Sequence, residues 1–462
     1  SFFYLRRSEI NNKTDVVFLN KEKQIEILQK GTTFTSIEKS ATIGDGIFQL
    51  NDSEQNRFIS KYLQNKRLSV QKFVPASGAA TRMFKFLYEF VNEEKESDEL
   101  HFFQENLKKF PFYSEQISGK NLKEIIRQLL FEEPFRFSEK PKAFIPFHKY
   151  GCEVRNALEE HISESLQLNT EEIHFTISPH HEHLIKTYLK QNIKITYSYQ
   201  NPETDTFCVD ENGNVVTNEN GEPFRRPAGH GALLENINRL SADLIFIKNI
   251  DNIQPERTQP LSVRWKRVIG GLLMQIIELR NSVLEKIKEG NAYNRSHLAE
   301  LGKYFPAINQ CETIEDLKSF LNRPLRVAGM VKNTGAPGGG PFWVRDRNGN
   351  LSLQIVEKSQ IDLSNPQQKQ LLEQATHFNP VDMVIHIKDF EGKTFDLTKY
   401  RDDNACFISE KTYKGKPIKA LEMPGLWNGS MADWLTVFVE IPSEIFTPVK
   451  TVNDLLSPGH QT

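Results

Sequence analysis

The sequence has few cysteines, almost no net charge and no long apolar run, and each absence excludes a class of protein. Its four cysteines are widely separated and form no Cys-x-x-Cys pair, which argues against a zinc knuckle or a disulfide framework and fits a reducing cytoplasm. Lysine and arginine number 58 against 60 aspartates and glutamates, so no global field attracts nucleic acid or an anionic membrane, and any anion site must be local.

Long apolar segments are also missing. No stretch approaches the roughly 18 apolar residues of a transmembrane helix. The first residues, SFFYLRRSEI, contain no apolar region followed by a small-residue cleavage site. Residue 1 is not Met, so the removal of a leader peptide remains an alternative. We therefore expect a globular protein with no membrane partner.

Short apolar runs, typical of buried strands, alternate with longer helical patterns. The expected strands lie at residues 70–74, 173–177, 193–199, 244–248, 325–330, 351–356 and 384–387, and the longest expected helix lies at 263–287. Asn-Gly pairs in DENGN (210–214) and DRNGN (346–350) suit tight hairpin turns, so part of the sheet is antiparallel. The alternation predicts an α/β protein with a central mixed, mostly parallel sheet flanked by helices.

The 462 residues suffice for one large or two medium domains. Residues 1–69 are interpreted as an extension that packs on the core, with polar helices at 21–30 and 52–66. Residues 70–462 are interpreted as the main domain. Helical periodicity dominates its part 92–168, which we interpret as a helical insertion beside a ligand cleft.

The stretch FVPASGAATRMFK, residues 73–85, joins an expected strand to an expected helix that starts at Thr81-Arg82. A turn of Ser, Gly and Ala lets backbone N–H groups approach a ligand closely, and a helix N-terminus favours phosphate. Arg82 would add a rigid fork of donors. The alternative is a plain connection with Gly78 in a special backbone conformation and Arg82 on the surface. The stretch matches neither a P-loop nor a dinucleotide fingerprint.

Two later segments carry further candidates. In PAGHGALLENINRLSADLIFIKNIDNI, a Gly-His-Gly loop precedes an apolar strand, and Asp251 follows that strand where α/β folds place ligand sites. An aspartate there is a natural Mg²⁺ ligand, although it also suits a turn or a helix cap. In EIFTPVKTVNDLL, Lys450 follows a strand and a proline bend; it is able to reach phosphate, or to be solvated like most lysines.

Three other features have two interpretations each. The histidines around TISPHHEHL, including His181, lack the H-E-x-x-H spacing of a zinc site, and contact with substrate through His181 or Glu182 is favoured over zinc. KNTGAPGGGPFWVRD, residues 332–346, is either a flexible loop over a bound ligand or a hairpin connection. GLWNGSMADW, residues 425–434, is favoured as a loop that anchors the core.

Several segments resemble one enzyme family in the same order along the chain. PAGHGALLENI…DLIFIKNIDNI is similar to the "PPGHG…IFVSNIDN" region of UDP-glucose pyrophosphorylases, and IFTPVKTVNDLL to their "F.PVKT.SDLL" segment. SGAATRM resembles the "GG.GTRM" phosphate loop of nucleotidyltransferases, and TISPHHEHL resembles "SFNTHEDT". LQIVEKSQI and HFNPVDMV are similar to the "LLEIAQV" and "FNTNNLW" pair. The whole chain resembles an uncharacterised bacterial family that shares VPASGAASRMFK, KNTGxPGGGPFWV and PGLWNGxMA.

The resemblance implies a nucleotide-diphospho-sugar transferase (GT-A) fold, Rossmann-like, and a reaction in which a nucleoside triphosphate, UTP above all, and a sugar 1-phosphate give a nucleotide sugar and pyrophosphate. It implies Mg²⁺ as cofactor, on Asp251, with Arg82 and Lys450 as further catalytic residues. The residues implied to contact the nucleotide are Ser77, Gly78, Ala79, Ala80, Thr81, Arg82, Gly229, His230 and Gly231. Those implied to contact the sugar and its phosphate are Glu357 and Asn379, with His181 added from its place in the sequence.

Departures from the family pattern keep a second hypothesis open. Ser-Gly-Ala-Ala replaces a glycine-richer loop, and for the lysine of the family's "GPK" segment only Lys85 offers a candidate. A catalytically silent nucleotide-sugar binding or regulatory protein on the same fold is therefore the alternative. A P-loop-type kinase has only Gly78 and Arg82 in its favour. The sequence does not identify the nucleobase, the sugar or the oligomeric state.

Overall fold

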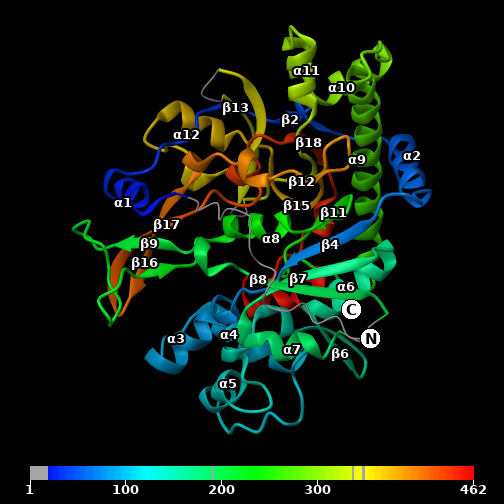
Figure 1. Cartoon of the computed structure of the whole chain (residues 1–462). Helices are drawn as coiled ribbons and strands as arrows, with labels where there is room; N and C mark the ends of the chain where they lie inside the picture. The colour runs from blue at the N-terminus through cyan, green and yellow to red at the C-terminus, as the bar shows by residue number, and fades with distance from the viewer. Residues whose placement is uncertain (1–18, 190–191, 336–337, 346–348) are drawn as a thin grey trace, which may run out of the picture.

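We describe the protein from a computed structural model, which places residues 19–189, 192–335, 338–345 and 349–462; the side chains of residues 379–381 also lie outside the described part. The N-terminal stretch SFFYLRRSEI and the first three residues of DRNGN therefore lie outside the described residues. No helix in the described ranges is long and apolar enough to cross a membrane. The view in Figure 1 shows a central sheet with helices on both faces and a helical lobe below it.

The central sheet has nine strands in the order β2-β3-β18-β12-β15-β11-β4-β7-β8. Only β15 among them runs antiparallel to both of its neighbours, so the other eight point the same way. Their bounds are β2 (Thr42–Ile43), β3 (Gly46–Phe48), β4 (Val70–Pro75), β7 (Glu172–Ile177), β8 (Lys194–Tyr199), β11 (Leu244–Ile247), β12 (Leu325–Lys332), β15 (His377–His386) and β18 (Leu435–Glu440). This is the predicted mixed, mostly parallel sheet, and its parallel strands bring their carboxyl ends to one edge.

Alternating side chains of the sheet enter two apolar cores. In β11, Leu244 and Phe246 face the long helix α9 (Gln259–Lys288), whereas Ile245 and Ile247 face α8 (Leu234–Asn238). Helix α2 (Asp52–Leu63) packs on α9, beside α6 (Ala157–Leu168). The remaining helices of the body are α1 (Lys21–Lys30), α7 (Glu182–Lys186), α10 (Arg295–Tyr304), α11 (Ile314–Leu321) and α12 (Pro366–Glu373).

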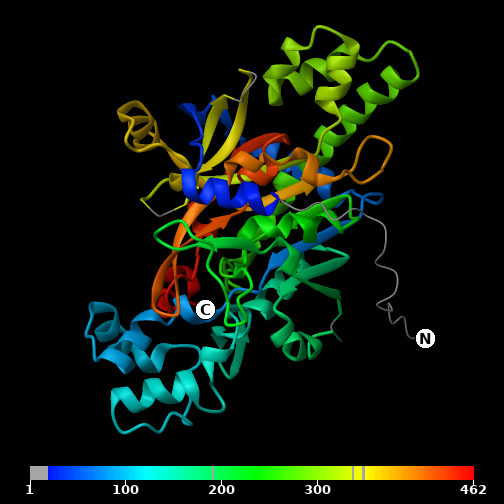
Figure 2. The same cartoon turned by 60° about the vertical axis from the view of Figure 1, so that its left-hand side comes forward.

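A lobe rich in phenylalanine extends from the sheet (Figure 2) and contains α3 (Lys85–Glu93), α4 (Asp98–Asn106) and α5 (Leu122–Phe131). We call these three helices and their connections the helical lobe. Phenylalanine rings fill its core, in stacked pairs such as Phe84–Phe137 and Phe110–Phe112 and in edge-on pairs such as Phe86–Phe103. Its core is continuous with residues of β4 and β7, so the lobe is fixed to the sheet.

Three smaller sheets complete the fold. They are β1-β13-β14, with β1 (Ile37–Ser40), β13 (Gly339–Arg345) and β14 (Leu351–Glu357); β10-β9-β17-β16, with β9 (Thr206–Val209), β10 (Arg225–Arg226), β16 (Phe407–Tyr413) and β17 (Lys416–Glu422); and the hairpin β5 (Pro146–Tyr150) and β6 (Glu153–Asn156). The predicted turn at 210–214 is present, with Gly213 at φ 80°. The region expected to be helical, 92–168, also contains the β5-β6 hairpin, and its last helix, α6, packs on α9.

Candidate functional site

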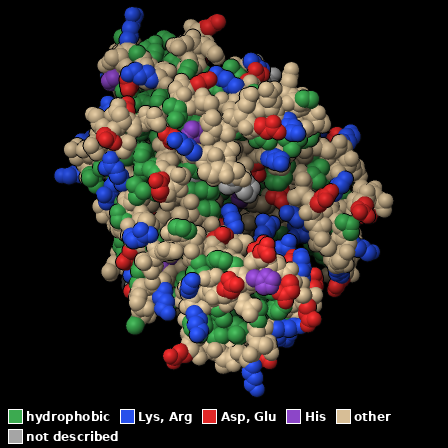
Figure 3. Space-filling view, turned by 180° about the vertical axis from the view of Figure 1, so that it is seen from behind, with side chains coloured by type: hydrophobic (Ala, Val, Ile, Leu, Met, Phe, Trp, Pro, Cys, Tyr) green, Lys and Arg blue, Asp and Glu red, His purple; other side chains and the backbone are tan. Residues whose placement is uncertain are grey.

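Loops from three distant parts of the chain meet at the carboxyl edge of the sheet. They follow β4 (residues 76–82), β11 (248–251) and β18 (441–450). Asn252 and Pro448 form a β-bridge, and the N–H of Val449 donates to the carbonyl of Asp251 at 3.0 Å. Seen from behind (Figure 3), the surface is hollowed between the lobe at the bottom and the body above, and Lys and Arg side chains gather there.

Asp251 and Lys450, far apart in the sequence, lie together. The Lys450 Nζ is 3.7 Å from Asp251 Oδ2, and its side chain is 62% exposed, whereas the carboxylate is 15% exposed. The segment 447–450, which we call the lysine segment, is held in place by its backbone: the N–H of Thr447 donates to Asn252 Oδ1 at 2.9 Å, and the N–H of Lys450 donates to the Asp454 carboxylate at 2.8 Å. An exposed ammonium beside a recessed carboxylate suits a ligand that carries phosphate.

Lys142 is the site residue that the sequence interpretation missed. Its Nζ donates to the carbonyl of Val449 at 2.8 Å and pairs with Asp251 Oδ2 at 3.1 Å, and its side chain is only 14% exposed. Lys85, the candidate considered instead, is 77% exposed on α3 and pairs with Glu89. The sequence signal for Lys142 was the dipeptide Pro141-Lys142, which matches the last two residues of "GPK". The helical lobe separates this dipeptide from the loop after β4 in the sequence.

The loop after β4 is open to solvent at its centre. An added Cβ on Gly78 would have no heavy atom within 4 Å, and Gly78 does not adopt a positive φ, so the special backbone conformation weighed for it is wrong. Ala79 bridges Pro141, and the carbonyl of Gly78 accepts from the N–H of Lys142 at 3.1 Å, which places Lys142 beside the loop. Ser77 is half-buried, Ala80 is buried and Thr81 is exposed.

The helix expected to begin at Thr81-Arg82 begins later, and that prediction is wrong. Residues Ala80–Arg82 form a single 3-10 turn, and α3 starts only at Lys85. The reason is burial: Met83 and Phe84 enter the core of the lobe, which turns the chain before the helix starts. Arg82 is exposed and has no hydrogen bond or ion pair within the described residues, so its guanidinium is available to a ligand.

The Gly-His-Gly loop packs against the loop at 425–429. His230 Nδ1 accepts from the N–H of Leu426 at 3.0 Å, and its ring lies 4.6 Å from that of Trp427. Gly229 has φ 79°, and a Cβ on Gly231 would overlap the carbonyl oxygen of Pro424. Both glycines are therefore required for this close approach.

His230 also reaches toward Glu357. Because Nδ1 is an acceptor, the hydrogen of the neutral ring is on Nε2, which lies 3.6 Å from Glu357 Oε1. The interpretation of 425–434 as a core anchor holds for Trp434, which is buried, while Trp427 is half-buried beside His230. The candidate nucleobase loop and a candidate sugar contact are thus neighbours.

The remaining predicted residues lie as follows. His181 Nε2 contacts the carbonyl of Glu139 at 2.9 Å, between α7 and the lobe. Asn379 is in β15, but its side chain lies outside the described residues. Part of the loop at 332–346 lies outside them as well; Gly339 and Gly340, which are described, begin β13 and pair with β14.

The donor set around Asp251 fits one kind of metal site. Mg²⁺ typically binds one or two carboxylates and completes its coordination with substrate phosphates and water. Asp251 supplies one carboxylate, and both of its side-chain contacts in the described chain use Oδ2. No group of three or more His, Cys, Asp or Glu able to hold a metal occurs among the described residues. Asp251 therefore offers one of the one or two carboxylates that Mg²⁺ typically takes from a protein.

A buried ionic cluster lies behind this edge, where β4 and β11 pack on α6 and α9. The Nζ of Lys72 is 2.6 Å from Glu164, the Nζ of Lys248 is 3.0 Å from the same carboxylate, and Lys266 pairs with Asp382. Burial lowers the pKa of Lys72 to about 7, although Glu164 opposes the shift. Lys248 lies three residues before Asp251 in the sequence, so the cluster fixes the end of β11 from which the loop with Asp251 extends.

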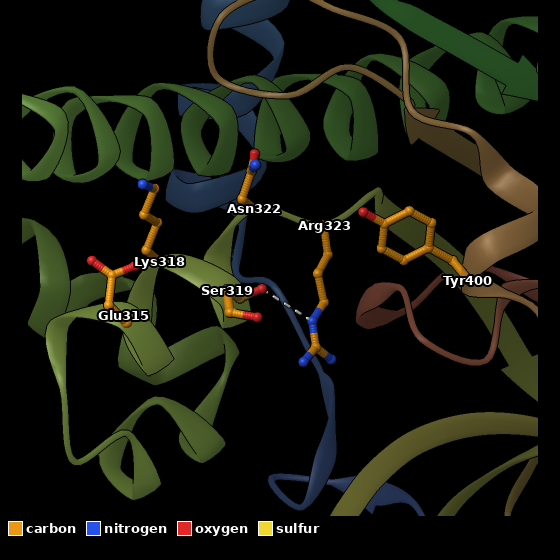
Figure 4. Close-up of a pocket in the computed structure, with 6 residues that line it drawn as sticks. All are labelled: Glu315, Lys318, Ser319, Asn322, Arg323 and Tyr400. Carbon is orange, nitrogen blue, oxygen red and sulfur yellow. Dashed lines mark hydrogen bonds between the residues drawn. The ribbon is translucent and has the colours of Figure 1, made fainter.

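A separate cavity of about 350 Å³ lies near α11 and is lined by Glu315, Lys318, Ser319, Asn322, Arg323 and Tyr400. It is next to the amino end of β12, which begins at Leu325, and hence away from the carboxyl edge. In Figure 4 the guanidinium of Arg323 points away from Glu315 and Lys318, and its Nε donates to the Ser319 carbonyl at 3.4 Å. These side chains do not converge on one ligand position.

Comparisons with known proteins place the chain in a family. The structure is similar to the uridine diphosphate N-acetylglucosamine pyrophosphorylase of Trypanosoma brucei, with 12% identity, a TM-score of 0.49 and coverage of 94% of this chain and 74% of that one. It is similar to a UDP-glucose pyrophosphorylase variant of Leishmania major, with 12% identity, a TM-score of 0.45 and coverage of 94% and 73%. The search of curated proteins found no match. The model of the family described as a domain of unknown function (DUF4301) matches residues 7–461, and the chain therefore belongs to that family.

Proposed function

We propose that this chain is a cytoplasmic, Mg²⁺-dependent nucleotidyltransferase that joins a nucleoside triphosphate, UTP in the first place, to a sugar 1-phosphate and releases pyrophosphate. The observation that carries the proposal is the meeting of Asp251, Lys142 and Lys450 beside the exposed Gly78 loop. One carboxylate, two ammonium groups and a loop of small residues form a set suited to a polyphosphate.

The reaction needs alignment and charge neutralisation more than acid–base chemistry. An oxygen of the sugar phosphate, already ionised, forms a bond to the α-phosphorus of the nucleotide, and the bond to the β-phosphate oxygen breaks, so pyrophosphate leaves. Lys450, exposed and able to turn, would follow the charge on the α-phosphate. Lys142 and Arg82 would hold the leaving phosphates, which need no proton at neutral pH.

Asp251 would hold the magnesium ion, which when bound would supply charge neutralisation on the phosphate oxygens. The residues of this chain would do the rest. The loop at 77–82 would place backbone N–H groups on the phosphates, and the Gly229–His230–Gly231 loop would hold the nucleobase. Glu357, Asn379 and His181 remain the proposed contacts of the sugar and its phosphate. The 3.6 Å between His230 and Glu357 supports adjacent nucleoside and sugar positions.

One observation favours the binding protein as a second candidate. Asp251 Oδ2 already faces two ammonium groups, at 3.1 and 3.7 Å, and these compensate its charge without a metal. If they stay in place when nucleotide binds, the chain would recognise a nucleotide sugar without turning it over. The two candidates share the ligand and differ in turnover.

The test is a pyrophosphate-release screen of nucleoside triphosphates against sugar 1-phosphates with and without Mg²⁺. We expect release with Mg²⁺, and a loss on the order of 10²–10³-fold in Asp251→Asn and Lys450→Gln with the melting temperature nearly unchanged. Lys85→Gln, at an exposed lysine that pairs with Glu89 and not with Asp251, is the matched control and should keep wild-type turnover. Melting shifts with ligand but no release would support the binding protein. Neither shift nor release would refute both.

A further inference from the structure

A buried chain of polar side chains ends on the lysine segment. Glu160 Oε1 lies 3.0 Å from His148 Nδ1, and His148 Nε2 lies 2.8 Å from His460 Nδ1. His460 Nε2 then donates to the carbonyl of Thr447 at 2.8 Å. All three side chains are buried, and the hydroxyl of Tyr150 donates to Glu160 Oε1 at 2.8 Å. We call Glu160, His148 and His460 the relay.

Thr447 is the first residue of the lysine segment, so the relay acts where both site lysines are placed. The backbone of Val449 pairs with Asp251, and its carbonyl accepts from Lys142 at 2.8 Å. A shift of Thr447 would therefore move Lys450 and remove the acceptor that orients Lys142. Through His148 and His460, the relay links Glu160 in α6 to Thr447 by consecutive hydrogen bonds.

The residues around His460 hold it against the lysine segment. A Cβ on Gly459 would overlap the side chain of Thr447, so only glycine permits this approach. The guanidinium of Arg257 donates to the carbonyl of Gln461 at 3.3 Å, and the Thr462 hydroxyl donates to the carbonyl of Lys149 at 2.7 Å. Residues 459–462 are thus clamped between β5 and the lysine segment.

The hydrogens in the relay can be counted. The carbonyl of Thr447 can only accept, so His460 Nε2 carries a hydrogen. Burial, reinforced by His148, lowers the pKa of His460 to about 4, so near pH 7 its ring is neutral and Nδ1 accepts. His148 Nε2 must then donate. His148 Nδ1 faces Glu160 Oε1, which also accepts from the Tyr150 hydroxyl, so the Glu160 end of the relay is buried and fixed by hydrogen bonds.

We propose that Glu160, His148 and His460 are positioning residues, which hold the lysine segment against Asp251 while the ring of His460 is neutral. The inference rests on the proposed function for its role in catalysis. One more proton would set two N–H groups face to face between the rings. A hydrogen bond of the relay would then be lost and the segment released.

Other charged groups surround the relay. Tyr150, Glu159 and Arg155 lie around Glu160, and Asp454 and Asp251 act on His460 through space. Asp454 also accepts from the N–H groups of Lys450 and Thr451, so it holds the same segment independently of the relay. The test must therefore separate the effect of the relay from that of Asp454. Variants in which one position of the relay cannot titrate make this separation.

The test measures hydrogen–deuterium exchange of a peptide covering residues 446–452 between pH 4 and pH 9, with rates corrected for intrinsic exchange. In the wild type we expect protection to be highest near neutral pH and to fall about tenfold toward pH 4, where His460 becomes protonated. His460→Gln keeps an acceptor and a donor but does not titrate, so protection should persist and the acid decline should shrink. Glu160→Gln keeps a polar partner for His148, so it should keep both the protection and the acid decline, because His460 still titrates.

The matched controls are His460→Leu, which breaks the relay, and His101→Gln, an exposed histidine on α4. The first should lose about tenfold in protection at all pH values, and the second should match the wild type; α9 serves as the internal reference peptide. A flat wild-type profile, or equal losses in His460→Gln and His460→Leu, overturns the proposal. If His460→Leu does not fold, the two glutamine variants decide. The readout needs no turnover, so absent pyrophosphate release would refute the proposed function and leave the relay standing.

Discussion

Replacing Lys142 by methionine tests the site at the residue that the sequence did not reveal. The change removes one ammonium and keeps an unbranched side chain of similar length. The lost hydrogen bond to the Val449 carbonyl, at 2.8 Å, is worth roughly 1 kcal/mol. The lost ion pair is worth roughly another 1 kcal/mol, because Asp251 keeps Lys450 at 3.7 Å as a counter-ion. We expect the free energy of unfolding to fall by about 2 kcal/mol.

The expected loss of turnover is larger than this loss of stability. If Lys142 holds the leaving phosphates, kcat should fall on the order of 10²–10³-fold, as for other preorganised electrostatic groups. Urea unfolding and pyrophosphate release, measured on the same preparation, separate the two effects. Lys85→Met is the control, and its free energy of unfolding should change by less than about 0.5 kcal/mol. A Lys142→Met enzyme with wild-type kcat would show that Lys142 does not act on the reacting phosphates.

Three further predictions concern the loop, the core and acid stability. Gly78→Val should fold normally, since no atom lies within 4 Å of the added Cβ, but should weaken nucleotide binding; an unchanged nucleotide-induced melting shift would argue against the loop assignment. Gly271→Ala should lower the unfolding free energy by about 1–3 kcal/mol in urea titrations, because its Cβ would overlap the Phe58 carbonyl where α9 crosses α2; wild-type stability would contradict this packing. His460 is kept neutral with a pKa of about 4, so the unfolded chain takes up its proton first, and about 3 kcal/mol of stability should be lost as the pH falls from about 6.5 to 4. His460→Gln should lose less over that range, and an identical loss would refute the assignment.

The fold was largely predictable because its strands are marked by short apolar runs. The helix expected at 21–30 is α1 (Lys21–Lys30), and the expected strand at 173–177 lies within β7. The reversed direction of β15 was not predictable, because strand order depends on contacts between segments far apart in sequence. The start of α3 was misplaced because Met83 and Phe84 are drawn into the lobe, an effect of tertiary packing that local patterns do not contain.

The site was predictable only where its parts stand in recognisable segments. Asp251 and Lys450 each follow a strand in such a segment, and the structure brings them together. Lys142 stands after a helical lobe, so its closeness to Gly78 exists only in three dimensions. The relay was equally hidden, because His148 and His460 are single histidines without a shared motif and are 312 residues apart in the sequence.

The bridge between Ala79 and Pro141 gives the chain freedom to vary. The chain leaves the sheet edge at Ala79 and returns to it beside Ala79 at Pro141, so the helices in between form an insertion whose two ends are adjacent. Added or deleted residues in the outer part of that insertion, around α4 and α5, change its size without changing the position of Lys142. Over evolutionary time, relatives of this protein can therefore acquire lobes of different length and surface, and with them different regulators, while the same three charged side chains stay in register.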